Sequence, residues 1–227
     1  MKTKFVFSMV MLSVLVAPMK ADAIPQTQKE VKKSARVLSE MLADSDTRIP
    51  PWLLKRSRAI AIITNLKQGG FGLGGRRGDG VILSKFSDGT WSHPSFINMS
   101  GGSIGFQAGF KSSDLILVFP SQAAVDDVID GSFELGGSVS GTAGPLGRSV
   151  SDSFEGFDDN KIYVYSRSKG LFGSVALEGS DMSIDHKDNA RFYGRPITVK
   201  EIFSQPSLAA PPVVNSLKQV LQQASRY

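Results

Sequence analysis

Residues 69–80, GGFGLGGRRGDG, form the stretch whose residue types and spacing first suggest chemistry. Gly70, Gly72 and Gly75 match the G-x-G-x-x-G spacing of dinucleotide-binding loops, in which glycines bring a pyrophosphate close to the start of a helix. A strand is predicted before these glycines, but the residues after them favour turns and strands and show no helical periodicity. A nucleotide site is therefore not expected, and the Arg-Gly-Asp tripeptide at 77–79 is interpreted as a turn between strands.

The rest of the chain does not predict catalysis or a metal centre. The sequence has no cysteine, and its two histidines, His93 and His186, are far apart, whereas a zinc site needs three or four ligands. No serine lies in a G-x-S-x-G motif, and the acidic pair Asp158-Asp159 is interpreted as a solvated turn. We expect a non-enzymatic protein that needs no cofactor or metal.

Basic residues are concentrated in one acid-free segment. From residue 48 to 77 the chain has seven basic residues and no acidic one, and a tryptophan stands there beside two leucines. Tryptophan favours the membrane–water interface, and each cation near an anionic leaflet contributes roughly 1 kcal/mol. The predicted lipid-binding residues are Trp52, Leu53, Leu54, Lys55, Arg56, Arg58, Lys67, Arg76 and Arg77.

Two alternatives stay open. Lys55, Arg56 and Arg58 can instead complement the C-terminus of a short helix while Trp52 packs in the core. Acidic residues are concentrated between residues 111 and 148, so an acidic helix there is a candidate surface for a protein partner in a cell-envelope structural or interaction protein.

The first 23 residues predict export. They combine a basic start, an apolar run and the ending Ala21-Asp22-Ala23, which is typical of a signal peptide cleaved near Ala23. The apolar run is too short for an ordinary membrane-spanning helix, and an uncleaved interfacial anchor is the alternative. Removing this segment lowers the net charge from +5 to +3, which does not predict a nucleic-acid partner. We expect a periplasmic or secreted protein with peripheral membrane association.

All 23 glycines lie between residues 69 and 194, and the flanks are helical in pattern. Thr27 and Glu30 match a capping box, Pro51 suits the first position of a second helix, and Ser121 is expected to cap a helix over 122–129. A tight turn is predicted at 87–90. Strands are predicted at 59–64, 80–86, 114–120, 161–167 and 174–179. These elements predict an α+β fold, with a glycine-rich, mainly antiparallel, curled or barrel-like sheet and packed N-terminal, central and C-terminal helices.

The C-terminal part has a separate character. Residues 24–203 are expected to form one domain, 204–212 a proline-rich linker, and 213–227 an amphipathic helix. That helix is expected either to dock on the sheet or to serve as a tail that binds a partner or a membrane.

Several ordered motifs resemble the SYLF domain, which is a lipid-binding domain that is also catalogued as an actin-binding module. They are Ile49-Pro50 with Leu53-Leu54, then AIAII, GGFGLGGRRGDGVIL, GSFELGGSVSGTAGPLGR, IYVYSRSKGLFGSVALEGS and ARFYG, spread from about residue 29 to 193. The resemblance, here to a secreted bacterial-type member, implies an α+β domain without catalytic residues that binds anionic phospholipid or phosphoinositide head groups. In eukaryotic members it implies actin filaments as a further partner. It associates the lipid site with the helix from Lys29 and with residues 52–58.

Overall fold

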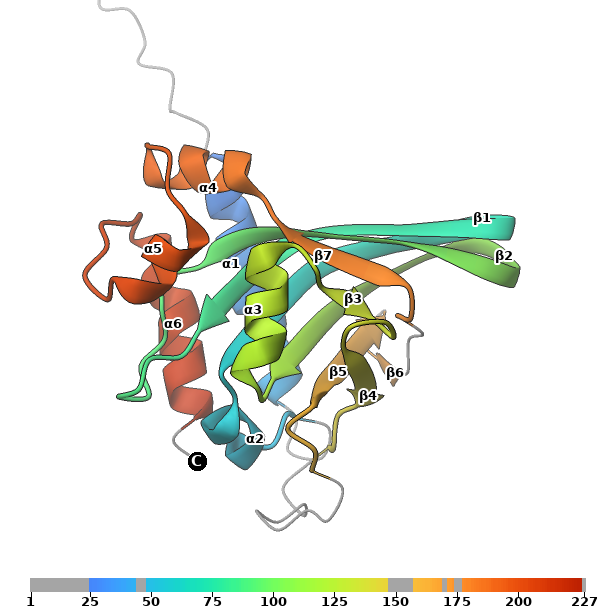
Figure 1. Ribbon diagram of the computed structural model, residues 1–227, viewed down its shortest axis with the longest axis horizontal. Coiled ribbons are helices and arrows are strands. Elements are labelled where there is room, and N and C mark those ends of the chain that lie inside the picture. The colour runs from blue at the N-terminus through green and yellow to red at the C-terminus, as the bar shows by residue number, and fades with distance from the viewer. Residues whose placement is uncertain (1–24, 44–47, 147–156, 169–170, 174–176, 226–227) are drawn as a thin grey trace, which may run out of the picture.

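The computed structural model describes residues 25–43, 48–146, 157–168, 171–173 and 177–225, and the predicted signal peptide at 1–23 lies outside them. Six helices and seven strands are described (Figure 1). In chain order they are α1 (Gln26–Ala43), α2 (Pro51–Arg56), β1 (Ala59–Ser84), β2 (Ser95–Phe119), α3 (Gln122–Asp130), β3 (Glu134–Leu135), β4 (Ser140–Ala143), β5 (Lys161–Ser168), β6 (Leu171–Gly173), β7 (Ser180–Ile184), α4 (His186–Tyr193), α5 (Val199–Ser204) and α6 (Val213–Ala224).

The described strands form one sheet organised around β2. Its order is β3-β7-β2-β5-β4, with β1 paired to β2 and β6 paired to β5. All pairs are antiparallel except β4 with β5. Strand β2 pairs with β1 along one edge, and on its other edge it pairs with β7 near one end and β5 near the other. The predicted α+β class with a mainly antiparallel, curled sheet is confirmed.

The paired segments 59–63 and 115–119 have both faces buried. Ile60 and Ile62 point into one core with side chains of α1, α2 and α6, while Ile63 points into a second core with α3. Alternate side chains of a strand face opposite sides, so a strand covered by helices on both sides needs apolar residues at every position. The continuous apolar runs of the sequence therefore mark the middle layer of the molecule.

Strands β1 and β2 are far longer than the rest of the sheet requires. They have 26 and 25 residues, whereas a typical strand has about five or six. Their outer part is a two-stranded ribbon that projects from the body (Figure 1). The ribbon folds back near a register shift between Gly70 and Gly72, so that Gly80 crosses directly over Ile62. A Cβ atom at Gly80 would lie 2.2 Å from the carbonyl oxygen of Ile62, and glycine is therefore needed for the crossing.

The prediction of a turn within 69–80 is wrong. This segment is strand, and its Arg-Gly-Asp tripeptide pairs with residues 98–100 of β2. Cross-strand pairing satisfies the backbone groups that a turn would have used. The glycines permit bending and close crossing, in agreement with the predicted glycine-rich, curled sheet. The turn predicted at 87–90 is confirmed, because the amide of Phe86 donates to the carbonyl oxygen of Thr90 at 2.8 Å and Gly89 has a φ of 82°.

The helix starts were predicted with mixed success. Pro51 is the first residue of α2, and the hydroxyl of Ser121 accepts a hydrogen bond from the amide of Ala124. The capping box is wrong, because α1 begins before Thr27 and the carboxylate of Glu30 accepts a hydrogen bond from Thr64 of β1 instead. Burial raises the pKa of Glu30, as expected for a carboxyl drawn into the contact between α1 and the sheet.

Two helices were missed and one strand was misplaced. α4 begins after Asp185, which accepts from the amide of Asp188 at 2.9 Å, and α5 begins after Thr198, which accepts from the amide of Glu201 at 3.2 Å. Both are N-caps that the sequence contains. Of the strand predicted at 174–179, residues 174–176 lie outside the described residues, and 177–179 precede β7 instead of forming a strand.

The C-terminal helix lies against the body. Val214, Leu217 and Leu221 of α6 are buried in the core that contains Val31 and Leu38 of α1. Docking is therefore observed, but chiefly on α1 where docking on the sheet was expected. The amphipathic pattern of α6 reflects this contact.

Candidate functional site

The apolar side of α2 is part of the core. Trp52 is 6% exposed, Leu53 and Leu54 are fully buried, and the Trp52 ring packs edge-on against Phe157 with centroids 5.5 Å apart. The expectation that these three side chains meet a membrane interface is contradicted, because a short helix beside the sheet is stabilised by burying its apolar side. The alternative interpretation, with Trp52 in the core, agrees with the structure.

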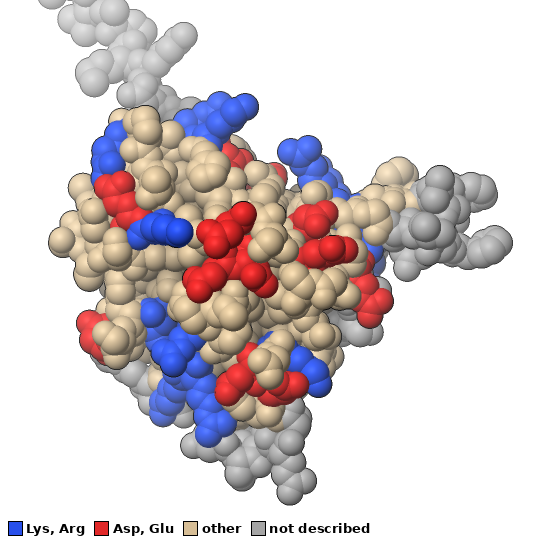
Figure 2. All heavy atoms as spheres, in the orientation of Figure 1, with Lys and Arg blue, Asp and Glu red and all other residues tan. Residues whose placement is uncertain are grey.

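Three exposed cations lie at the C-terminal end of α2 and just after it, and we call them the α2 patch: Lys55, Arg56 and Arg58. The guanidinium of Arg56 lies 5.7 Å from the ring centroid of Trp52 and 5.2 Å from that of Phe157. These rings orient the cation by cation–π attraction. Figure 2 shows basic side chains gathered over α2 at the lower edge of this face.

Lys85 links the α2 patch to the end of β1. Its ammonium group donates to the carbonyl oxygen of Leu54 and, at 3.1 Å, to that of Lys55, so it caps the C-terminus of α2. Burial, with a smaller contribution from Arg58, lowers the pKa of Lys85 to about 8. Below that pH, Lys85 adds a further positive charge beside the patch.

Among the residues that the structure describes, no acidic side chain forms an ion pair with the cations of the α2 patch. Within the described ranges, none of the three forms an ion pair, and neither do Lys67 and Arg77. Six other cations do form ion pairs, namely Arg36, Lys161, Arg167, Arg191, Arg195 and Lys200. The patch therefore presents net positive charge to an incoming anion.

The remaining predicted cations lie on the ribbon, apart from the α2 patch. Lys67 and Arg77 are exposed, but Arg76 is only 7% exposed. The Arg76 guanidinium donates to the hydroxyl of Ser180 at 3.0 Å and to the carbonyl oxygen of Gly102 at 3.3 Å. It joins β1, β2 and β7, and the expectation that it contacts head groups is contradicted by this burial.

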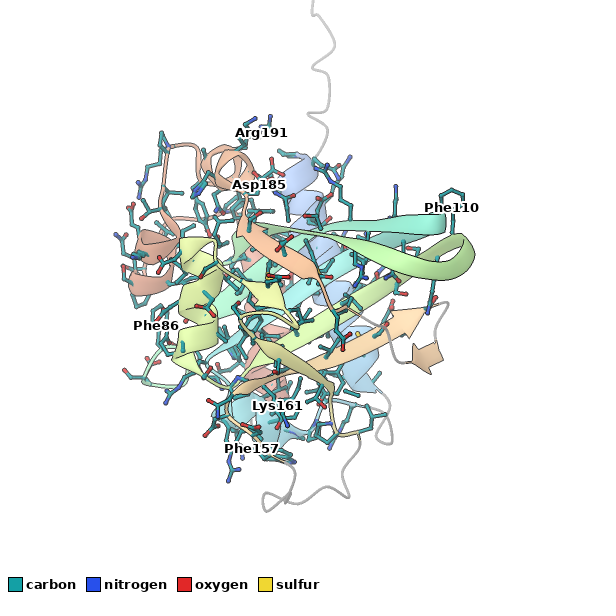
Figure 3. The ribbon with its side chains drawn as sticks, turned by 45° about the vertical axis from the view of Figure 1, so that its right-hand side comes forward. Phe86, Phe110, Phe157, Lys161, Asp185 and Arg191 are labelled. Atoms are coloured by element: carbon teal, nitrogen blue, oxygen red, sulfur yellow. The ribbon has the colours of Figure 1, made fainter. Side chains whose placement is uncertain are left out.

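The outer ribbon contains a feature that the sequence reasoning missed. We call residues 67–77 together with 100–112 the arm. Phe110, at its outer end, is 96% exposed (Figure 3). The signal was available, because the acid-free character noted for 48–77 recurs at 100–112, where Lys111 is the only charged residue.

A second charged surface lies over α3. Asp126 and Asp130 are exposed, and Figure 2 shows acidic side chains gathered over this helix at the centre of the face. Lys200 of α5 approaches Asp130 at 3.8 Å, which leaves Asp126 and the half-buried Asp127 without a cation in contact among the described residues.

The described residues contain neither a candidate metal site nor a candidate membrane-spanning helix. No group of three or more His, Cys, Asp or Glu side chains is placed to hold a metal ion. No helix in these ranges is both long and apolar enough to cross a bilayer. His93 is half-buried, and burial lowers its pKa.

Comparison with known proteins gives consistent similarities. A sequence model of the Ysc84 family, described as "Las17-binding protein actin regulator", matches residues 100–224. The chain is 40% identical over 208 residues to LAS seventeen-binding protein 3 of Saccharomyces cerevisiae (strain YJM789), which covers 88% of this chain and 45% of that protein. It is 39% identical over 208 residues to Protein YSC84 of Saccharomyces cerevisiae (strain ATCC 204508 / S288c), with 88% and 44% covered.

A vertebrate relative shows the same pattern. The chain is 33% identical over 179 residues to SH3 domain-containing YSC84-like protein 1 of Xenopus laevis, which covers 76% of this chain and 53% of that protein. The chain thus spans about half the length of the curated relatives it matches.

Proposed function

The chain belongs to the Ysc84 family, whose domain the sequence motifs already resembled, and on that premise we propose that it is a non-enzymatic protein that binds anionic membrane surfaces through the α2 patch. The observation that supports this proposal is the state of Lys55, Arg56 and Arg58, which are exposed, adjacent and free of ion pairs within the described residues. Three cations at an anionic leaflet contribute roughly 3 kcal/mol, about a hundredfold in partitioning. The interaction is electrostatic and therefore sensitive to salt.

Vesicle co-sedimentation tests this function. The protein is expressed with residues 1–23 in place, purified after processing, and mixed with phosphatidylcholine vesicles with or without phosphatidylserine. We expect binding only to the anionic vesicles, weakening as salt rises. A variant with Lys55→Glu, Arg56→Glu and Arg58→Glu should lose about a hundredfold in affinity or more.

A matched variant tests whether binding depends on the α2 patch or only on the net charge of the protein. Lys187→Glu, Arg191→Glu and Lys200→Glu reverse three exposed cations elsewhere on the surface. We expect this variant to bind nearly as the parent does. Equal loss in both variants, or equal binding to neutral and anionic vesicles, would remove the α2 patch as the site.

The acidic surface over α3 favours a second candidate function, the binding of a protein partner. The family description names Las17 binding and actin regulation, and Asp126 and Asp127 face outward without a cation in contact in the described structure. We propose that this surface binds a basic segment of a partner. Opposite charges across such an interface mainly speed association and set specificity.

Binding assays with a Lys/Arg-rich peptide and with filamentous actin test the second candidate. Asp126→Asn with Asp127→Asn is expected to weaken peptide binding, whereas Asp158→Asn with Asp159→Asn serves as the control. Unchanged peptide binding by the first variant would exclude the α3 surface. Actin binding that persists in it would place any actin contact elsewhere.

We also propose that the protein is exported and processed near Ala23, as the first 23 residues predict. Fractionation followed by mass spectrometry of the N-terminus tests this. A mature N-terminus at Ile24 is expected, and an intact Met1 in the same fraction would refute cleavage.

A further inference from the structure

The arm lacks the support that the rest of the sheet has. Strand β7 pairs with residues 97–101 of β2 and β5 pairs with 114–118, so between them β2 has only β1 as a partner among the described strands. About five residues at roughly 3.4 Å each carry the arm roughly 17 Å from the sheet. Figure 1 shows it standing clear of the helices.

The composition of the arm is unusual for a free ribbon. Residues 67–77 and 100–112 contain nine glycines, five large apolar residues, four basic residues and no acidic residue. A free sheet edge in solution is normally blunted by charged side chains, by proline or by a bulge, because a long hydrophobic edge favours aggregation. An arm that contains five large apolar residues, and whose charged residues are all cationic, is suited to a surface that is apolar inside and anionic outside.

Phe110 is held outward. It pairs with Gly69 across the ribbon, and its ring occupies the space beside that glycine, since a Cβ atom at Gly69 would lie 2.4 Å from the Cδ1 atom of Phe110. The ring thus lies over the neighbouring strand at the outer end of the arm and reaches no core (Figure 3). Exposing a phenylalanine leaves a large hydrophobic gain unused until a partner surface buries it.

Lys67 and Lys111 lie nearer the body than Phe110, at the depth where lipid phosphates would lie when the ring enters a bilayer. Lys67 pairs with Ser112, two residues from the Gly69–Phe110 pair, so Lys67 lies on the same face of the ribbon as Phe110 and roughly 7 Å nearer the body. Lys111 follows Phe110 directly and is exposed. A phenyl ring at the outer end with cations behind it matches acyl chains behind a layer of phosphates.

We propose that the arm is a membrane anchor, in which Phe110 enters the interface of an anionic bilayer while Lys67 and Lys111 contact lipid phosphates. This anchor rests on the proposed function for its choice of an anionic lipid surface. It adds an apolar contribution that salt does not screen to the electrostatic contribution of the α2 patch.

Substitutions at Phe110 test the anchor on phosphatidylcholine–phosphatidylserine vesicles. Phe110→Ala is expected to weaken binding about tenfold, and the loss should persist at high salt. Phe110→Trp should retain binding, because tryptophan favours the interface. Leu146→Ala is the matched control, since Leu146 is the other exposed large apolar residue among those described, and it should bind as the parent does.

The absence of cysteine allows insertion to be observed directly. A Phe110→Cys variant carries one attachment point for a polarity-sensitive dye, and Asn215→Cys on the exposed side of α6 gives a control position. We expect a blue shift, and quenching by spin-labelled lipid, at position 110 and not at 215. A dye at 110 that stays in water while the protein is vesicle-bound would overturn the anchor.

The outcomes separate this inference from the proposed function. If the α2-patch reversal abolishes binding while Phe110→Ala binds normally, the anchor is refuted and the α2 patch stands. If Phe110→Ala weakens binding while the reversal does not, the anchor stands and the α2 patch is refuted. If Phe110→Ala changes only the oligomeric state in solution, the arm meets a second copy of the chain and the anchor is refuted.

Discussion

Arg76 and Arg77 are neighbours in the sequence with opposite surroundings in the fold. Residues that follow one another on a strand point to opposite faces, so Arg77 is exposed while Arg76 is buried against Gly102 and Ser180. A charge count along the chain treats them alike. Only the pairing of β1 with β2 and β7 distinguishes the surface cation from the structural one.

Arg76→Met is expected to lower the free energy of unfolding by about 2 kcal/mol, because it removes two hydrogen bonds to a buried charged group. Chemical denaturation measures the change. Arg77→Met, at the exposed neighbour, should alter stability by less than about 0.5 kcal/mol. Equal effects of the two substitutions would contradict the buried position of Arg76.

Lys85 gives the protein a stability that depends on pH. The folded protein releases this proton near pH 8, whereas the unfolded chain retains it up to the ordinary lysine pKa of 10.5. Between these values the unfolded state binds more protons, so stability rises with pH. Relative to Lys85→Met, the free energy of unfolding of the parent should rise by about 1 kcal/mol between pH 8 and 10.5. This value is smaller than the full pKa difference implies, because solvent screens the partly exposed amine.

Denaturant titrations of both proteins at several pH values check this prediction. Since the other ionisable groups are shared, the difference between the two curves isolates Lys85. A difference that is flat with pH, or that falls as pH rises, would show that the Lys85 amine is not desolvated in the folded protein.

At the scale of elements, β1 decides what the sequence could and could not predict. Its first residues, 59–64, read as a strand because both faces are buried and apolar. Residues 80–86 were also predicted as a strand, but 69–79 were assigned to a turn because glycine signals local freedom. The contacts that make 69–79 a strand come from β2, roughly 20 to 40 residues away. Local pattern thus predicted the core segments and missed the ribbon.

The candidate site also contains residues whose positions could be predicted from the sequence and others whose positions could not. The exposed cations of the α2 patch follow from composition, since charged side chains are rarely buried without a partner. The position of Trp52 could not be predicted from composition, because an aromatic residue beside cations suits both a membrane interface and a protein core. Phe110 was missed because its exposure depends on the lack of a third strand beside the arm.

Gly80→Ala tests the crossing of the two halves of β1. The added methyl group would meet backbone atoms of Ile62 and Ile63 at 2.2–3.0 Å, so the loss of stability should reach about 2 kcal/mol or more. Gly102→Ala is the control, because nothing lies within 4 Å of its added Cβ atom. Thermal unfolding of the two variants compares them, and equal melting temperatures would contradict the crossing.

At the scale of the whole molecule, the C-terminal helix completes a core that begins at the other end of the described chain. Val214, Leu217 and Leu221 are at most 1% exposed and pack with α1. Each buried side chain of this kind contributes about 1.5–3 kcal/mol. Residues nearly 200 positions apart therefore share one layer over the sheet.

Deletion of residues 213–227 is accordingly expected to lower the melting temperature by about 10 °C or more and to raise the binding of a hydrophobic dye. Calorimetry and dye fluorescence measure these effects. A truncated protein as stable as the parent would show that α6 is dispensable for the fold and would return it to the role of a free tail.

The exposed ring at the end of the arm also affects how the protein behaves at high concentration, with no lipid present. Two molecules can shield Phe110 from water by bringing their arms together, but the three exposed cations of each arm, with no anion beside them in its sequence, oppose that approach. Salt weakens the repulsion and strengthens apolar association. We therefore expect light scattering to report larger particles as ionic strength rises, and Phe110→Ala to abolish that growth, so that the protein is best stored in dilute buffer.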